Sequence, residues 1–278
     1  MQFGISTHLY HDQRLGRDHL AQIAGYGFEA VELFATRSHF DYHDPANIDR
    51  LRTWLDETRL TLHSVHLPIF ESYGPGGTGA AFSIAATDSA RRQAAVQEAG
   101  AAIELLKHIP AKMVVVHLGS PAKYAGTGDN SRASAARSTE EICRIAEPLG
   151  ARVAMEVIPN PLSSASSLVA MIERDFDGSN VGICLDFGHA HLMGDVADDI
   201  EIVAEHLITT HVHDNRGKDD DHLVPYQGTI NWPAALVSML KIGYEGTYLL
   251  ELASTGNPAA VLEEARRARQ RIERALAE

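Results

Sequence analysis

Nine side chains that can bind metal ions lie at the ends of strand-like runs or in the loops directly behind them. They are His66, His117, Glu156, Asp186, His189, His211, Asp220, His222 and Glu251. Mixed sets of imidazole and carboxylate ligands suit Zn²⁺, Mn²⁺, Fe²⁺ or Co²⁺, and residue types alone do not separate these metals. Because the nine occur where strands stop, we predict one polynuclear metal site at one mouth of a barrel.

The acids are the most informative members of this set. Glu156 interrupts the apolar run AMEV, Glu251 stands in LLEL, and Asp186 closes the run CLD. A buried carboxylate without a partner costs several kcal/mol or becomes neutral, so such acids are generally paired or metal-bound. Few basic residues lie beside these strand ends, which favours a metal over salt bridges.

The histidines are weaker evidence one by one, because a single strand-end histidine is more often a hydrogen-bonded core residue than a ligand. His63 stands an odd number of residues from His66, so it is expected on the opposite face of its strand. His8 ends the first strand and is expected to line the pocket as a substrate contact. His211 and His213 can face the same way, and we choose His211 because it lies nearer the body of its strand.

The elements that position these residues alternate regularly. Strands are predicted at residues 3–7, 30–34, 60–66, 113–118, 152–157, 181–186, 208–213 and 247–252. Helical patterns with 3.6-residue apolar spacing lie between them, and the one at residues 232–242 has Pro233 in its first turn and Gly243 past its end. The strand runs are apolar without alternation, as in parallel strands buried on both faces. Eight such units predict an α/β fold, a (β/α)8 TIM barrel formed by residues 1–278 as a single domain.

Two stretches are longer than ordinary connections, at residues 68–87 and 120–130, and both are rich in glycine. Loops of this length usually carry function or are disordered. Both follow strands and therefore emerge at the carboxyl-terminal face, where active sites of this architecture lie. We interpret them as loops that cover a substrate, with plain flexible insertions as the alternative.

The composition and charge of the chain limit the classes of partner that it is expected to bind. A net charge of −13 and a pI near 5.5 disfavour nucleic acid, whose affinity for proteins comes largely from Lys and Arg on phosphates. Several cations in one pocket could still bind a phosphorylated substrate. Cys143 and Cys184 form neither a disulfide framework nor a metal motif, and no signal peptide or membrane span is evident. We expect a soluble cytoplasmic protein without a membrane partner, and a homo-oligomer stays open.

At these residues the chain resembles the xylose isomerase-like TIM barrel superfamily, which contains the sugar phosphate isomerases/epimerases and the endonuclease IV group (AP endonuclease family 2). Two motifs carry the resemblance: DFGH at residues 186–189 and DNRGKDDDHL at residues 214–223. The run YQGTINW at residues 226–232 is similar to the isomerase-like branch, which speaks against the endonuclease.

The resemblance implies two sets of ligands. Glu156, Asp186, His211 and Glu251 match the mononuclear site of ketose epimerases, in which the two glutamates also move protons. A histidine matching His189 would contact substrate there, and Arg216 lies near the family's substrate arginine.

The whole set also matches the trinuclear site of endonuclease IV, in three groups. One metal would lie between His66, His117 and Glu156, a second in the epimerase set, and a third between His189, Asp220 and His222. The resemblance therefore implies one to three divalent ions (Mn²⁺, Zn²⁺, Co²⁺ or Fe²⁺) per chain.

The leading hypothesis is a metal-dependent isomerase or epimerase of a sugar or sugar phosphate, with Glu156 and Glu251 as the catalytic residues. Proton transfer would pass through a metal-stabilised enediolate. The alternative is a phosphoester hydrolase that uses two or three metals, motivated by the ligands beyond the mononuclear set. A metal-stabilised binding protein without catalysis is a third reading, because fold does not determine function.

Overall fold

Eight parallel strands form a closed barrel in the order of the chain, β1 to β8. The computed structural model describes residues 2–73, 78–254 and 256–277. The strands are β1 (Gln2–Ser6), β2 (Ala30–Phe34), β3 (Thr61–His66), β4 (Met113–His117), β5 (Arg152–Glu156), β6 (Val181–Asp186), β7 (Leu207–Val212) and β8 (Thr247–Leu250). The predicted (β/α)8 barrel is confirmed, and the bounds of each strand lie within two residues of the predicted ones.

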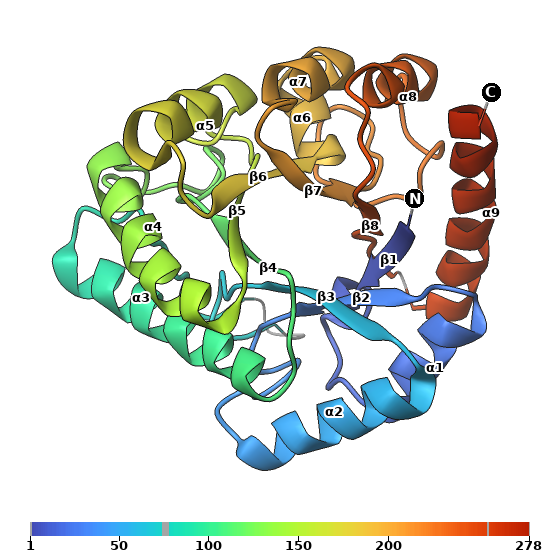
Figure 1. Cartoon of the computed structure of the whole chain (residues 1–278), viewed down its shortest axis with the longest axis horizontal. Helices are drawn as coiled ribbons and strands as arrows, with labels where there is room; N and C mark the ends of the chain where they lie inside the picture. The colour runs from blue at the N-terminus through green and yellow to red at the C-terminus, as the bar shows by residue number, and fades with distance from the viewer. Residues whose placement is uncertain (1, 74–77, 255, 278) are drawn as a thin grey trace.

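Helices surround the barrel on its outside (Figure 1). They are α1 (Arg17–Gly25), α2 (Pro45–Thr58), α3 (Ser89–Ile103), α4 (Arg132–Ala146), α5 (Ala165–Met171), α6 (Phe187–Met193), α7 (Val196–Val203), α8 (Trp232–Lys241) and α9 (Pro258–Ala277), with short turns η1 (Thr7–Tyr10), η2 (Glu104–Lys107), η3 (Glu147–Leu149) and η4 (Ile172–Phe176). Among the described residues, none of these helices combines the length and apolarity needed to cross a membrane.

Side-chain chemistry explains where the helices begin and end. The α8 helix starts where Asn231 accepts a hydrogen bond from the amide of Ala234, with Pro233 in the first turn, and it stops before Gly243 at φ 66°. The α2 helix starts in the same way at Asp44, with Pro45 as its first residue. These are the start and stop signals that helix termini prefer.

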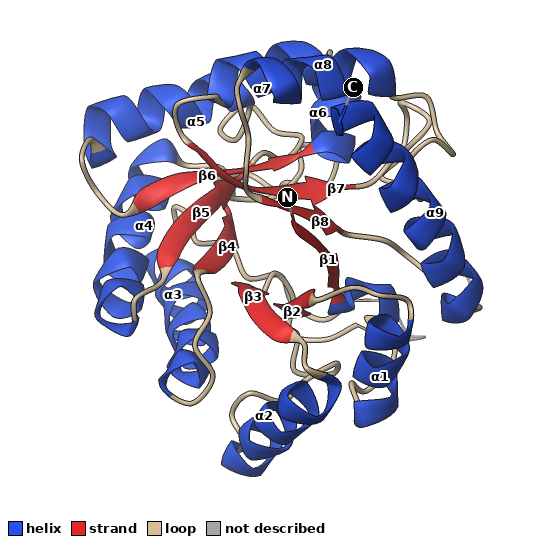
Figure 2. Cartoon of the chain, turned by 45° about the vertical axis from the view of Figure 1, so that its right-hand side comes forward, coloured by secondary structure: helices blue, strands red, loops and turns tan. Residues whose placement is uncertain are grey.

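The main hydrophobic core includes buried side chains from both the strands and the helices, and the helices surround the sheet in Figure 2. A second, small cluster of Val115, Ala154 and Cys184, with Ile208 against it, packs apart from that core. Polar side chains also meet across the barrel: Glu32 of β2 contacts His211 of β7, and these strands are not neighbours in the sheet. The interior of the barrel is therefore partly apolar and partly hydrogen-bonded.

An irregularity in strand pairing changes which side chains face inward. Between β2 and β3 the register shifts so that Val31 pairs with Leu62 but Glu32 pairs with Ser64, which leaves His63 as an extra residue. An extra residue in a strand resets the alternation of its faces. His63 Nε2 lies 3.1 Å from Thr209 Oγ1 of β7, across the barrel. The expectation that His63 faces away from His66 is therefore wrong, because the irregularity brings both into the barrel.

Candidate metal centre

The deepest part of the site is a group of four buried side chains from consecutive strands. Glu156 ends β5, Asp186 ends β6, His211 lies in β7, and Glu251 directly follows β8, and their ligand atoms all lie within 4.8 Å of one another. Strand register places them, since Asp186 pairs with His211. Among the described residues, these four form the largest group that meets this distance limit, and all four were predicted from the sequence.

This group fits a divalent cation. Three carboxylates converge on His211 Nδ1, at 3.3 Å from Glu156 Oε1, 3.5 Å from Glu251 Oε2 and 3.8 Å from Asp186 Oδ2. Glu156 Oε1 and His211 Nδ1 are buried and form no hydrogen bond among the described residues. Buried polar atoms are normally satisfied, and carboxylate oxygens with an imidazole nitrogen are ligands for Zn²⁺ or Mn²⁺. The donor set therefore matches the predicted ion.

The spacing of DFGH follows from how α6 begins. Asp186 is the residue before the helix, and its Oδ1 accepts a hydrogen bond of 2.7 Å from the backbone amide of His189, three residues on. A helix commonly starts this way, with an aspartate satisfying a free amide. One oxygen of Asp186 is thereby held in place, and the imidazole of His189 stands beside the site.

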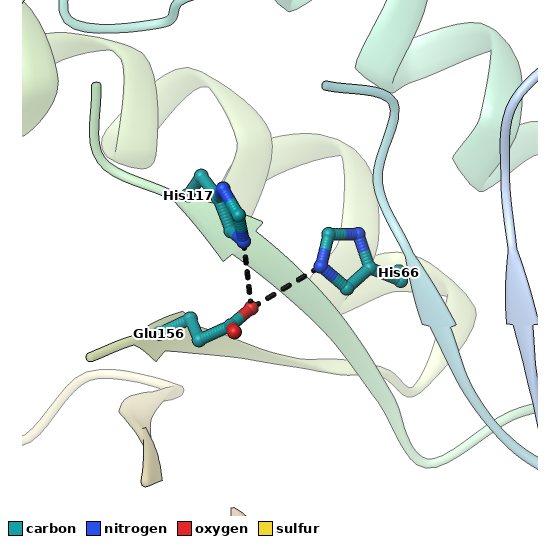
Figure 3. A group of neighbouring side chains, drawn as sticks. All are labelled: His66, His117 and Glu156. Carbon is teal, nitrogen blue, oxygen red and sulfur yellow. Dashed lines mark hydrogen bonds and ion pairs between the residues drawn. The ribbon is translucent and has the colours of Figure 1, made fainter. Parts of the chain in front are cut away.

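Two further histidines bind the other oxygen of Glu156, as Figure 3 shows. His66 Nε2 lies 3.2 Å and His117 Nε2 lies 3.0 Å from Glu156 Oε2. Burial alone would raise the pKa of Glu156, but the charges of His117 and His211 hold it well below its usual value. Burial likewise opposes a charged His66, yet the hydrogen bond and charge of Glu156 raise the pKa of His66 to about 9.

The third predicted group also comes together, around Asp220. Its Oδ2 lies 3.0 Å from His189 Nε2 and 3.1 Å from His222 Nε2. The structure adds His213, which the sequence reasoning set aside in favour of His211. The His213 ring is fully buried, with Nε2 at 3.1 Å from Asp186 Oδ2 and 3.8 Å from Asp220 Oδ1. The two-residue spacing of His211 and His213 was the signal for it.

A glycine makes room for this ring. A Cβ atom on Gly188, inside α6, would lie 1.9 Å from His213 Cε1. The glycine of the DFGH motif therefore allows α6 and the residue after β7 to approach closely enough for His213 to reach Asp186.

Several imidazoles are held by main-chain carbonyls. The Nδ1 atom of His66 lies 2.9 Å from Leu67 O, that of His189 lies 3.1 Å from Val157 O, and that of His222 lies 2.9 Å from Glu251 O. Each contact leaves the Nε2 atom facing a carboxylate. Such contacts on the far nitrogen select the tautomer and orientation of metal-binding histidines.

Above the ligands lies a cavity of about 440 Å³. Six of the candidate ligands line this cavity directly: His66, His117, His189, Asp220, His222 and Glu251. Aromatic side chains line it, among them Phe34, Phe70, Tyr73, Phe82 and Tyr124. Both long connections predicted to cover a substrate contribute to it, residues 68–87 with Phe70 and Tyr73 and residues 120–130 with Tyr124. Residues 74–77 of the first connection lie outside the described part of the chain.

Of the two predicted substrate contacts outside the ligand set, His8 lies at the cavity and Arg216 does not. His8 lines the cavity and its ring lies 4.6 Å from that of His222. Burial and the neighbouring His222 hold the pKa of His8 well below its usual value, which keeps it neutral. Arg216 is not among the lining residues; its side chain is 63% exposed and lies 3.6 Å from Asp221. The structure therefore does not place Arg216 at the cavity.

Comparison with known proteins identifies the family. Residues 20–272 match the model of the xylose isomerase-like TIM barrel family. The chain belongs to this family. A relative in it, uncharacterized protein MJ1311 of Methanocaldococcus jannaschii, is 30% identical over 258 residues, which are 90% of this chain and 83% of that protein.

Other family members have named activities. Inosose isomerase of Bacillus licheniformis is 28% identical over 137 residues, which span 45% of this chain and 48% of the relative. A D-tagatose 3-epimerase-like protein is 26% identical, with a TM-score of 0.79 covering 100% of this chain and 97% of the other. The IolI protein with a bound zinc atom shares the fold at 19% identity, with a TM-score of 0.76 covering 100% and 98%. Relatives of this chain therefore include isomerases and sugar epimerases.

Proposed function

We propose that this protein is a divalent-metal-dependent isomerase or epimerase of a sugar, a sugar phosphate or a related polyol. One observation carries the proposal: Glu156 from the end of β5 and Glu251 from directly after β8 both contact His211 Nδ1, in one buried group below a cavity of about 440 Å³. Two carboxylates beside one bound carbon can remove and return a proton. The named relatives, which include an inosose isomerase and an epimerase-like protein, support the same class of reaction.

The proposed roles follow from position. Glu156, Asp186, His211 and Glu251 would hold the cation, which when bound would polarise the carbonyl of the substrate. Glu251 lines the cavity, so it would transfer the proton from the exposed side. Glu156 lies beneath, where His66 and His117 contact its Oε2 atom, and the charges of His117 and His211 keep it ionised, the state in which it can accept a proton. His8 and His189, which both line the cavity, would contact substrate hydroxyl groups.

Solvent exchange tests this reaction. The protein loaded with Mn²⁺ or Zn²⁺ is incubated in deuterated water with a panel of ketoses and inososes, and deuterium at the carbon next to the carbonyl is measured by NMR. We include Zn²⁺ because the IolI structure holds zinc, and we include phosphorylated and free sugars. Deuterium in at least one substrate is expected. Its absence across the panel, with metal bound, would count against the proposal.

A phosphoester hydrolase is the second candidate. It is favoured by the ligands beyond the four-residue group, since His66 and His117 contact Glu156 and Asp220 joins His189 to His222. Among the described residues that line the cavity there is no lysine or arginine, so metal ions would have to bind the phosphate. Metal analysis of the purified protein separates the candidates. One ion per chain supports the isomerase, and two or three support the hydrolase.

A further inference from the structure

Glu32 is a buried acid that belongs to none of the ligand groups described above. It lies in β2 within the run AVELF, and its side chain has no exposed surface. Its Oε2 atom accepts a hydrogen bond of 2.8 Å from Ser64 Oγ and lies 3.1 Å from His211 Nε2. The irregular pairing between β2 and β3 brings Ser64 opposite Glu32. The carboxylate is therefore held behind a candidate ligand, on the side away from the other acids.

His211 is oriented differently from the other imidazoles. His66, His189 and His222 each place Nδ1 beside a backbone carbonyl and turn Nε2 towards a carboxylate, although Nδ1 of His189 also lies 3.4 Å from Glu156 Oε1. His211 turns Nδ1 towards Glu156 and Glu251, and its Nε2 faces the side chain of Glu32. The His211 ring is thus reversed, and a carboxylate takes the place of the backbone carbonyl on its far nitrogen.

The chemistry of the Glu32–His211 pair indicates which nitrogen of the His211 ring carries the proton. A neutral imidazole carries one N–H group, and an ionised carboxylate can only accept a hydrogen bond. With Glu32 as the acceptor, the proton of His211 stays on Nε2, and the Nδ1 lone pair points to the metal group. A carboxylate behind a ligating histidine also makes the imidazole a stronger donor.

We propose that Glu32 is the positioning residue of the metal centre: it fixes His211 as the Nε2–H tautomer and strengthens Nδ1 as a ligand. This inference rests on the metal site of the proposed function. It assigns Glu32 no contact with substrate. Ser64 supports the carboxylate in turn, and Glu32 Oε1 makes no hydrogen bond among the described residues.

The test compares Glu32→Gln with the wild-type protein in metal affinity. The Kd for Zn²⁺ is measured by competition with a chromophoric chelator, and the loss expected for removing such a partner is about 10- to 100-fold. Glu98→Gln is the matched control, because Glu98 accepts hydrogen bonds from Tyr42 and His43 but belongs to no ligand group and does not line the cavity. That variant is expected to keep the wild-type Kd. Glu32→Asp, which retains the charge, is expected to lose less affinity than Glu32→Gln and carries the test if the glutamine variant does not fold.

A spectroscopic readout separates positioning from simple stability. Long-range ¹⁵N–¹H spectra of the Zn²⁺-loaded wild-type protein should show His211 protonated at Nε2 and bound through Nδ1. A glutamine variant that is less stable without metal, yet binds Zn²⁺ with unchanged Kd, overturns the inference. So does protonation of His211 at Nδ1 in the wild type.

The outcomes also distinguish this inference from the proposed function. A weaker Kd in Glu32→Gln, in a protein that exchanges no substrate deuterium, supports the role of Glu32 and removes the isomerase. An unchanged Kd, in a protein that does exchange deuterium, removes the role of Glu32 alone. A wild-type protein that binds no divalent metal removes both.

Discussion

At the scale of single residues, the site separates acids by their access to the cavity. Glu251 lines the cavity, whereas Glu156 lies beneath it and is held by His66 and His117. The two glutamates should therefore respond differently to substitution, although both belong to the four-residue group.

Replacing Glu251 by glutamine should remove a proton-transfer group and keep much of the site's geometry. We expect the rate of substrate deuterium exchange to fall by about 10²- to 10⁴-fold, as is usual when a general acid or base is lost. The rate is measured by NMR on metal-loaded protein, with Glu98→Gln as the control. A Glu251→Gln variant that exchanges at the wild-type rate contradicts the assigned role.

Protonated histidines should make the metal-free protein sensitive to alkaline pH. Against the effect of burial, Glu156 raises the pKa of His66 to about 9, and Asp220 raises that of His222 to about 10, from an ordinary value of 6.5. A raised pKa in the folded state stabilises the protein fully below pH 6.5, and this contribution is lost as the pH rises through the folded values.

The Tm of protein kept in a chelator should therefore fall as the pH rises from about 6.5 through 9 and 10. Metal-loaded protein should show a smaller fall, because ligating imidazoles are already neutral. Differential scanning calorimetry of both forms checks this. A metal-free Tm that is constant over the same range would rule out charged His66 and His222.

Residue types also show what the sequence could and could not predict. All nine predicted ligands lie in the groups around Glu156, Asp186 and Asp220. Glu32 carried the same signal as Glu156, an isolated acid in an apolar strand, but sequence reasoning did not single it out. Arg216 could not be placed, because the turn that directs its side chain towards Asp221 is a property of the folded loop.

At the scale of elements, the short helix α6 connects the barrel to the ligands. Asp186 starts the helix, His189 stands in its first turn, and Gly188 makes room for His213 of the loop after β7. Close packing between α6 and this loop is therefore part of the metal site.

The substitution Gly188→Ala tests this packing. The added methyl group would collide with His213, and overpacking of this kind typically costs about 1–3 kcal/mol. We expect a lower free energy of unfolding in urea and a weaker Zn²⁺ Kd. Gly194→Ala is the control at the end of the same helix, since a Cβ there meets nothing within 4 Å. Equal effects of the two variants would contradict the role of Gly188.

Strand boundaries were predictable, whereas strand irregularities were not. The apolar runs located β2 and β6 at residues 30–34 and 181–186, as the structure has them. The orientation of His63 was missed because the register shift at Glu32 and Ser64 depends on pairing between two strands. No local pattern in either strand marks such a shift, and the alternation of faces on either side of it still looks regular.

At the scale of the whole molecule, the candidate ligands connect most of the barrel. They come from β3, β4, β5, β6 and β7, from the residue after β8, from α6 and from the loop after β7. A bound ion would therefore join strands that are far apart in the chain, and its binding should be linked to global stability.

Metal removal should consequently lower the Tm of the whole protein. For an ion present at about 100 times its Kd, binding to the folded state adds about 2.7 kcal/mol to the free energy of unfolding. Thermal unfolding with and without a chelator measures the change, and restoring Zn²⁺ or Mn²⁺ should reverse it. In Glu156→Gln the shift should be much smaller. A Tm that does not respond to chelation or to added metal would contradict a link between metal binding and the stability of the whole protein.

The main-chain support of the histidines bears on how this protein can evolve. The rings of His66, His189 and His222 rest on backbone carbonyls of Leu67, Val157 and Glu251, and a carbonyl is present whatever side chain the residue carries. The aromatic cavity wall comes largely from other segments, including the connections after β3 and β4. Mutations in that wall can therefore change which molecule is accepted and leave the orientation of these ligands intact. A lineage built on this barrel could thus acquire new substrates while the reactive floor stays the same.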